Sequence, residues 1–369
     1  MKPARRVLSI VGTRPNFMKV APVAHRLAQR ADVEHILIHT GQHYDNAMSR
    51  VFFEELGLPE PDAYLEIGSG SHTAQTARVL SRLEPVLRER RPDVVLVPGD
   101  VNSTLAAALT ARQLGLRVGH IEAGLRSFDW TMPEELNRVL TDQISDLLFI
   151  HSPEAREHLM AEGRPPDAIH DVGNTMIDTL VHLRGAIGER EAPAAYGVEP
   201  RGYVLVTLHR PALVDGALLE RALDALRELA ETYEVVFPLH PRTRARIDAL
   251  DGGVALPPGL RLIEPVGYLD FLSLAESAAG VLTDSGGVQE ETTFLGVPCF
   301  TLRANTERPI TVELGTNVVL GLDPARIIEI PRLLSEPSSN SGRVPAGWDG
   351  HAADRIVAVL DALPDDHVA

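Results

Sequence analysis

Residues 279–309, AGVLTDSGGVQEETTFLGVPCFTLRANTERP, place a strand, a glycine turn, a helix and a second strand in close succession. The apolar run 281–283 predicts the first strand, and Ser285-Gly286-Gly287 then lacks most of the Cβ atoms that would keep a ligand away from the backbone. Residues 288–295 are predicted to be helical, with Gly296 at the left-handed end. The start of this helix would point free N–H groups at an anion in the turn.

Neighbouring charges favour a nucleotide site over a simple tight turn. A Ser-Gly-Gly sequence before a helix is often only a turn capped by serine. Arg308, after the next predicted strand, carries the planar fork that closes over a phosphate. Glu290 and Glu291 suit the helix dipole, and a carboxylate there can also accept the two hydroxyls of a ribose. We therefore predict a nucleotide phosphate site at this turn.

The composition limits the partners of the chain. Its 369 residues favour two domains, and 35 basic against 51 acidic residues give a net charge of −16. This charge argues against a nucleic-acid or anionic-membrane surface, and no segment has the length of a membrane span. The single cysteine, Cys299, lies in an apolar stretch and is expected to pack in the core. It excludes an internal disulfide and fits a reducing compartment, so we predict a cytoplasmic protein.

Short apolar strands alternate with amphipathic helices along both halves, which predicts an α/β fold with two Rossmann-like doubly wound domains. The expected strands are residues 7–11, 34–39, 94–97, 117–121, 147–150, 203–208, 234–239, 260–263, 280–283 and 299–302. The expected helices are residues 17–29, 73–88, 103–114, 133–145, 217–231, 269–278 and 289–295. Loop-like residues mark the join, so we expect domains at 1–180 and 181–351, with a ligand cleft between them.

Charged residues follow several of the predicted strands, at the ends where open α/β sheets bind ligands. Asp100 and Glu122 follow the third and fourth strands, and Glu134 begins a helix. Each carboxylate has a structural alternative: Asp100 as a helix cap, Glu122 as the partner of Arg126, and Glu134 as a complement to the helix dipole. Their shared place on the ligand side favours proton transfer beside an anionic leaving group.

Basic residues and histidines complete this edge. Arg14 and Lys19 follow the first strand, and His209 and His240 follow the first two strands of the second domain. The histidines are scattered and no Asp-x-Asp pair occurs, so the sequence predicts a site without metal or cofactor.

Nine motifs in this order resemble the non-hydrolysing UDP-N-acetylglucosamine 2-epimerases. They are GTRPNFMKVAPV, TGQHYD, GDVNSTLAA, HIEAGLRS, MPEELNR, VGNTMIDTL, TLHR, LTDSGGVQEE and TERP. The resemblance runs nearly end to end and implies two Rossmann-like domains in a glycosyltransferase-B-like arrangement, with UDP in the cleft. A final helix crosses back to the first domain in this family, and residues 352–363 match it.

The resemblance implies interconversion of UDP-N-acetylglucosamine and UDP-N-acetylmannosamine. UDP leaves carbon 1, the resulting positive charge acidifies the hydrogen on carbon 2, and a carboxylate removes it to give 2-acetamidoglucal. Proton delivery to the other face and re-addition of UDP give the epimer. The acid/base positions of the family match Asp100, Glu122 and Glu134.

The resemblance also assigns substrate contacts. The residues matching pyrophosphate contacts, which stabilise the growing charge of the leaving group, are Arg14, Lys19, His209 and Arg308. The remaining matches are Ser285, Gly286 and Gly287 as further phosphate donors, Glu291 at the ribose and Phe271 near the uracil. An aromatic residue in a helix is more often part of the core, so only the motif match supports Phe271.

Two departures from the family affect the prediction. Relatives with Gln-His-Arg-Gln bind a second UDP-N-acetylglucosamine as an activator, whereas this chain has Gln42-His43-Tyr44-Asp45. Gln42 and His43, together with His240, are therefore candidate allosteric residues, and activation is not assumed. Many relatives follow the histidine-arginine pair with Arg-Glu-Asn, whereas Pro211-Ala212-Leu213 stands here.

Four alternatives stay open. TGQHYD and LHPRTR also resemble the 2-epimerases of UDP-diacetamido-uronic acids, although the TERP motif at Thr306 favours UDP-N-acetylglucosamine. A hydrolysing epimerase would release UDP, a glycosyltransferase of the same architecture would need an acceptor, and a nucleotide-sugar sensor would bind without turnover. A homodimer is expected from the family.

Overall fold

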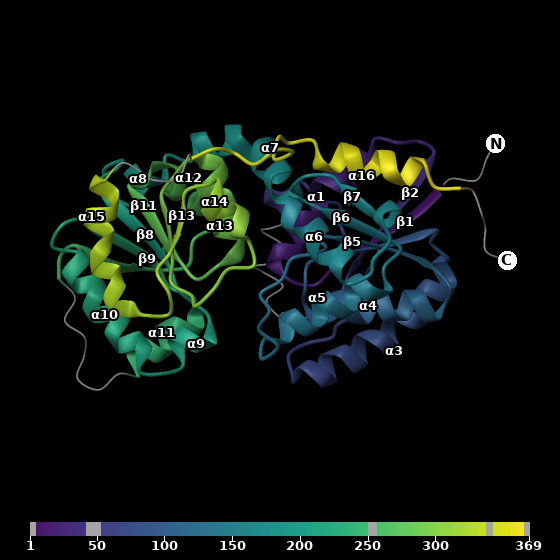
Figure 1. Ribbon diagram of the computed structural model, residues 1–369, viewed down its shortest axis with the longest axis horizontal. Helices are drawn as coiled ribbons and strands as arrows, with labels where there is room; N and C mark the ends of the chain where they lie inside the picture. The colour runs from purple at the N-terminus through teal and green to yellow at the C-terminus, as the bar shows by residue number, and fades with distance from the viewer. Residues whose placement is uncertain (1–4, 42–52, 250–256, 337–341, 365–369) are drawn as a thin grey trace. The chain divides into compact units, whose positions relative to one another are not determined.

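The computed structural model describes residues 5–41, 53–249, 257–336 and 342–364 (Figure 1). The chain divides into two compact units. Unit 1 is Met1–His182 with Ala346–Ala369, and unit 2 is Leu183–Pro345. Each unit is built on one parallel sheet with helices between successive strands, which confirms the predicted α/β fold class with two Rossmann-like units.

Unit 1 contains a seven-stranded sheet in the order β3-β2-β1-β4-β5-β6-β7. The strands are β1 Arg5–Val11, β2 Val33–His39, β3 Ala63–Tyr64, β4 Val94–Pro98, β5 Arg117–Ile121, β6 Leu147–Ile150 and β7 Ile169–Asp171. The helices are α1 Arg14–Ala28, α3 His72–Arg90, α4 Asn102–Gln113, α5 Pro133–Ile144, α6 Pro153–Ala161, a 3-10 turn Pro166–Ala168, α7 Thr175–Glu189 and α16 Ala352–Asp361. The strand order reverses between β1 and β4, where a parallel sheet of this kind opens a ligand crevice.

The central strands of unit 1 are buried on both faces. All five residues of β4 are buried, as expected for an apolar strand with helices on each side. Alanines of α4 (106, 107, 108 and 111) let this helix approach β1 and β4 closely, and they belong to the same apolar cluster. This packing fixes the carboxyl ends of the two strands beside each other.

Helix α16 packs on unit 1 although it lies at the end of the chain (Figure 1). Its residues Ala353, Ile356 and Leu360 share an apolar cluster with Val23 and Leu27 of α1. The carboxylate of Asp178 on α7 accepts the N–H groups of Ala352 and Ala353, so it caps the start of α16.

Unit 2 contains a six-stranded parallel sheet in the order β10-β9-β8-β11-β12-β13. The strands are β8 Tyr203–Thr207, β9 Glu234–Pro238, β10 Leu260–Ile263, β11 Gly280–Thr283, β12 Cys299–Thr301 and β13 Asn317–Val319. The helices are α8 Ala192–Ala195, α9 Pro211–Val214, α10 Leu218–Leu229, α11 Pro241–Asp248, α12 Tyr268–Ser277, α13 Gly286–Leu295, α14 Pro309–Glu313, a 3-10 turn Pro324–Glu329 and α15 Ile330–Ser335. The order reverses between β8 and β11.

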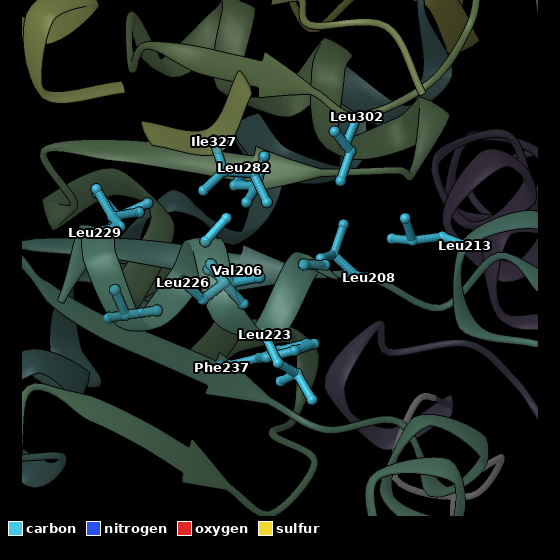
Figure 2. Packing of buried hydrophobic residues seen from close by; sticks show 14 of the residues in the cluster. Val206, Leu208, Leu213, Leu223, Leu226, Leu229, Phe237, Leu282, Leu302 and Ile327 are labelled. Atoms are coloured by element: carbon cyan, nitrogen blue, oxygen red, sulfur yellow. The ribbon is translucent and has the colours of Figure 1, made fainter. Parts of the chain in front are cut away.

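The larger core of unit 2 lies between the sheet and α10. Figure 2 shows Leu223, Leu226 and Leu229 of α10 packed with Val206 and Phe237 of the sheet. The leucines recur at helical spacing, so one face of α10 supplies them. A second cluster on the other face includes Val281 and Val288, which places the start of α13 firmly on the sheet.

The ten predicted strands are all present, each within two residues of its predicted bounds. Gly296 ends α13 with a φ of +70°, as predicted, and Cys299 is fully buried in β12. The sequence did not predict β3, β7 and β13, because two or three residues carry too little periodicity to be recognised. Among the described helices, none is long and apolar enough to cross a membrane.

Candidate active site

The loops after β1 and β4 meet at the switch point of unit 1 through Asn16. Its Oδ1 accepts the N–H groups of Gly12 (3.2 Å) and Thr13 (3.1 Å), and its Nδ2 donates to the carbonyl of Pro98 (3.1 Å). The side chain of Asn16 is buried, so these bonds are protected from water. One amide therefore joins the start of α1 to the end of β4.

Lys19 and Glu122 form a buried ion pair at this edge, with each side chain only 6% exposed. Glu122 follows β5 in a left-handed conformation (φ +72°), which is uncommon for a residue with a Cβ. The Nζ of Lys19 lies beside Gly99, where an added Cβ would come within 2.9 Å. The alternative partner Arg126 instead pairs with Asp142 (2.7 Å) and Glu162 (2.6 Å).

Asp100 is held by Arg138 of α5, and its backbone carbonyl accepts Asn137 Nδ2 (2.9 Å). Arg138 also pairs with the buried Glu135 (2.8 Å). The cap position of α4 is Val101, so Asp100 is not the helix cap that its position suggested. Glu134 lies one turn before Arg138 in the first turn of α5, which suits the helix dipole. The three predicted carboxylates therefore come from adjoining elements of unit 1.

Asp284 joins the loops after β8 and β11 at the switch point of unit 2. Its Oδ2 accepts the N–H groups of His209 (2.8 Å) and Arg210 (2.7 Å), and its Oδ1 lies 3.0 Å from His209 Nδ1. Burial works to raise the pKa of Asp284, but the hydrogen bonds from His209 and Arg210 outweigh it and lower the pKa. The carboxylate thus fixes the His209 ring, which is itself 41% exposed.

The glycine turn lies directly against Arg308. An added Cβ on Gly286 would come within 2.8 Å of Arg308 Cζ, so the guanidinium occupies the space that a larger residue would need. Ser285 precedes α13 as its cap residue and is partly exposed, while Gly286 begins the helix and Gly287 follows. Arg308 Nε lies 3.1 Å from Glu290 Oε1 on the same helix. The predicted turn, helix start and arginine are therefore brought together.

A polar network fixes the loop that carries Arg308. Glu307 forms a buried bidentate pair with Arg303 (2.6 and 2.7 Å). Thr306 Oγ1 donates to Gln289 Oε1 (2.6 Å) and accepts the N–H of Arg308 (3.1 Å). The bond from Thr306 to Gln289 connects the TERP motif to α13, and the other bonds hold the loop around Arg308.

The two residues predicted at the nucleoside lie on neighbouring helices. Glu291 is buried on α13 and accepts the hydroxyl of Tyr268 at 2.8 Å. Burial and this carboxylate raise the pKa of Tyr268 well above its ordinary value. Phe271, on α12, is partly buried and packs against the second apolar cluster of unit 2.

The candidate allosteric residues are only partly within the described structure. Gln42 and His43 lie outside the described residues, as does the side chain of Arg14 at the start of α1. His240 is exposed after β9, and its ring centroid lies 6.3 Å from that of His209. The described residues contain no group of three His, Cys, Asp or Glu side chains that could hold a metal ion.

Known proteins resemble the chain over almost its full length. The sequence model of the UDP-N-acetylglucosamine 2-epimerase family matches residues 25–361. The chain is 44% identical to the UDP-N-acetylglucosamine 2-epimerase of Methanocaldococcus jannaschii, over 95% of this chain and 97% of that protein. The chain belongs to the UDP-N-acetylglucosamine 2-epimerase family. The reaction in the family name is an epimerisation, so the members of the family are isomerases.

A solved structure of this relative and one further relative refine the comparison. A crystal structure of the M. jannaschii epimerase in complex with UDP-GlcNAc and UDP matches with a TM-score of 0.87 and 41% identity, over 96% of this chain and 99% of that one. The UDP-2,3-diacetamido-2,3-dideoxy-D-glucuronate 2-epimerase of Pseudomonas aeruginosa is 41% identical, over 97% of this chain and 100% of that protein.

Sequence reasoning missed several residues that build this epimerase-family site. Asn16, Arg138 and Asp284 connect strand ends or hold a predicted residue, and none was singled out. Asp284 had a usable signal, because it directly precedes the glycine turn and follows a buried strand. Asn16 and Arg138 do not directly follow a buried strand, and the bonds that join them to Pro98 and Asp100 span 82 and 38 positions.

Proposed function

We propose that the chain is a non-hydrolysing 2-epimerase that interconverts UDP-N-acetylglucosamine and UDP-N-acetylmannosamine. The supporting observation is the edge of unit 1, where Asp100 and Glu122 each lie against a buried cation and Glu134 follows on the adjoining helix. Carboxylates held in this way are suited to proton transfer. The three are the proposed acid/base groups of the reaction.

The chemistry explains why a nucleotide leaving group is required. No carbonyl lies beside carbon 2 of the sugar, so its hydrogen is not acidic in the intact substrate. Departure of UDP from carbon 1 gives an oxocarbenium-like centre, and loss of the carbon 2 proton to a carboxylate then yields 2-acetamidoglucal and UDP. Proton delivery to the opposite face and return of UDP to carbon 1 complete the exchange without net consumption of water.

Unit 2 supplies the proposed groups that hold and stabilise the departing UDP. Arg308 and the N–H groups of the turn at Ser285, Gly286 and Gly287 suit a pyrophosphate, as does His209. The remaining proposed contacts are Arg14 and Lys19 at the phosphates, Glu291 at the ribose and Phe271 near the uracil. The buried pairing of Lys19 with Glu122 supports a second role for Lys19, which is to hold that carboxylate in place.

Turnover in heavy water tests this function directly. Purified protein incubated with UDP-N-acetylglucosamine in D₂O should place deuterium at carbon 2 of both epimers, and the sum of the two nucleotide sugars should stay constant. Product without deuterium would rule out elimination and re-addition. Accumulating UDP with free N-acetylmannosamine would identify a hydrolysing epimerase instead.

A second candidate substrate is a UDP-diacetamido-uronic acid, which the 41% identity to the P. aeruginosa enzyme favours. Competition separates the two substrates. With equal concentrations of both, the ratio of their kcat/KM values follows from the rates at which each is epimerised. We expect the simple N-acetyl sugar to react faster, because the TERP motif is intact.

We also propose a cytoplasmic homodimer, as expected from the family. Unit 1 supports a dimer by exposing large apolar side chains from α5 and the loop before it: Phe128, Trp130, Leu136 and Leu140. Light scattering of the Leu136→Glu/Leu140→Glu variant should give the mass of a monomer.

A further inference from the structure

A buried histidine lies between the loops that carry Asp100 and Glu122. His120, near the end of β5, is fully buried, with Nδ1 2.7 Å from Asp142 Oδ1 and Nε2 2.7 Å from the carbonyl oxygen of Gly99. A peptide carbonyl only accepts hydrogen bonds, and so does an ionised carboxylate. Each ring nitrogen therefore faces an acceptor, and both bonds form only when both nitrogens carry a proton.

The surroundings balance the resulting charge. Asp142 is fully buried and also contacts Arg126 (2.7 Å), which in turn forms a bidentate pair with Glu162 (2.7 and 2.6 Å). Burial works to raise the pKa of Asp142, but His120 and Arg126 outweigh it and lower the pKa. A protonated His120 thus completes a set of two cations and two anions, as burial of charge requires.

Both ends of this network touch a loop of the proposed site. Gly99 immediately precedes Asp100, and its left-handed conformation (φ +67°) begins that loop. Asp142 Oδ2 accepts the N–H of Gly124 at 3.1 Å, two residues after Glu122. The ring and the carboxylate together connect the loop after β4 to the loop after β5.

We propose that His120, doubly protonated between Asp142 and Gly99, is a positioning residue that sets Asp100 and Glu122 relative to each other. This inference rests on the proposed epimerase function. A buried ion pair adds little to stability compared with apolar packing, so stability alone gives weak reason for charge at this point of a buried strand. Carboxylates that move protons to and from one carbon need a fixed separation, because a misplacement of about 1 Å can cost a hundredfold in rate.

Two substitutions separate the halves of the network. His120→Asn leaves an amide donor near the Nδ1 position, toward Asp142, and His120→Gln leaves one near the Nε2 position, toward Gly99. We expect kcat to fall about tenfold or more in both, with the dissociation constant for UDP unchanged within about threefold. Glutamine should retain more activity, because the Gly99 carbonyl adjoins Asp100 directly. The matched control is His35→Gln. His35 is another histidine on a strand of unit 1, and its Nε2 lies 3.0 Å from Ser9 Oγ, away from Asp142 and Gly99.

The decisive readout is the partition of deuterium in D₂O. We compare the deuterium in recovered substrate with that in epimerised product during the initial phase of the reaction. A change in the spacing of the two carboxylates alters this ratio in the His120 variants. A purely structural role would lower the melting temperature and leave the ratio and kcat of the folded variants at the wild-type values, which would overturn the proposal.

Nitrogen NMR of histidine-labelled protein tests the protonation state without using activity. His120 should carry protons on both nitrogens at neutral pH, whereas His35, whose pKa burial lowers to about 4, should be neutral in the same sample. A neutral His120 would contradict the inference. If wild type shows no deuterium incorporation at all, the proposed function fails, and a doubly protonated His120 would show that the network itself was inferred correctly.

Discussion

In both units the strand order reverses at a switch point, but the proposed functional groups near it have opposite charge in the two units. In unit 1 the loops at the switch point present carboxylates, and buried Lys19 and Arg138 balance them. In unit 2 the equivalent loops present a glycine turn and Arg308, and buried Glu290 balances the arginine. Each of these loop groups therefore lies against a buried partner of opposite charge. The fold supplies the edge of the sheet, and the loop residues decide what it does.

This difference predicts a division of labour. A cation beside a carboxylate favours the ionised form that can accept a proton, whereas a guanidinium supplies the positive charge that a pyrophosphate needs. A variant of a unit 1 carboxylate should therefore stop exchange at carbon 2 and spare UDP binding. A variant in unit 2 should weaken UDP binding first.

The largest effect is expected for Glu122→Gln. The amide keeps the shape but cannot accept the proton, so epimerisation and deuterium incorporation should fall about 10²- to 10⁴-fold. UDP affinity, measured by calorimetry, should stay within about threefold of wild type. Glu157→Gln is the matched control, since Glu157 is exposed on α6 and the change is chemically the same. Loss of UDP affinity with intact exchange would reverse the roles of the two units.

The next largest effect is expected at the glycine turn. Arg308→Ala removes the charged fork and should weaken UDP binding about a hundredfold. Gly286→Ala should weaken it about tenfold without removing a charge, because the new Cβ displaces the end of a flexible arginine side chain.

The control for the glycine variant is Gly185→Ala on α7, where an added Cβ meets nothing within 4 Å. This change should leave UDP affinity unaltered, since it adds a methyl group to an open surface. Wild-type affinity in Gly286→Ala would show that Arg308 does not act from the observed position.

The sequence predicted strand ends better than it predicted the partners found there. Val94–Pro98 and Gly280–Thr283 are apolar runs followed by glycine or aspartate, so their carboxyl ends could be placed, and Asp100 and the glycine turn after them could be selected. The pairing of Glu122 with Lys19 could not be predicted, because it depends on a left-handed backbone at Glu122 and on residues 103 positions apart. The alternative partner considered for Glu122, Arg126, pairs with Asp142 and Glu162, which lie on helix α5 and after helix α6.

The last prediction concerns folding stability, not activity, at two buried aspartates that each accept two backbone N–H groups, Asp178 in unit 1 and Asp284 in unit 2. Burial raises the pKa of Asp178 to about 6, aided by Asp349 and Asp354, because these bonds offset it only in part. The pKa of Asp284 is lowered instead, since His209 contributes a further hydrogen bond. The same backbone contact therefore gives opposite pH dependence.

For Asp178 the folded state holds the proton more tightly, so the free energy of unfolding falls as pH rises from about 4 to about 6, by roughly 2–3 kcal/mol. Asp178→Asn should abolish this fall. For Asp284 the stabilisation is present above about pH 4 and is lost only as pH drops through its lowered pKa, so Asp284→Asn should cost the same at about pH 5 and about pH 7.5. Urea titrations of both variants and wild type at these two pH values measure the differences. If the cost of both substitutions were independent of pH, the pKa of Asp178 would not be raised by burial and by its neighbouring charges. The contrast between the two aspartates would then be wrong.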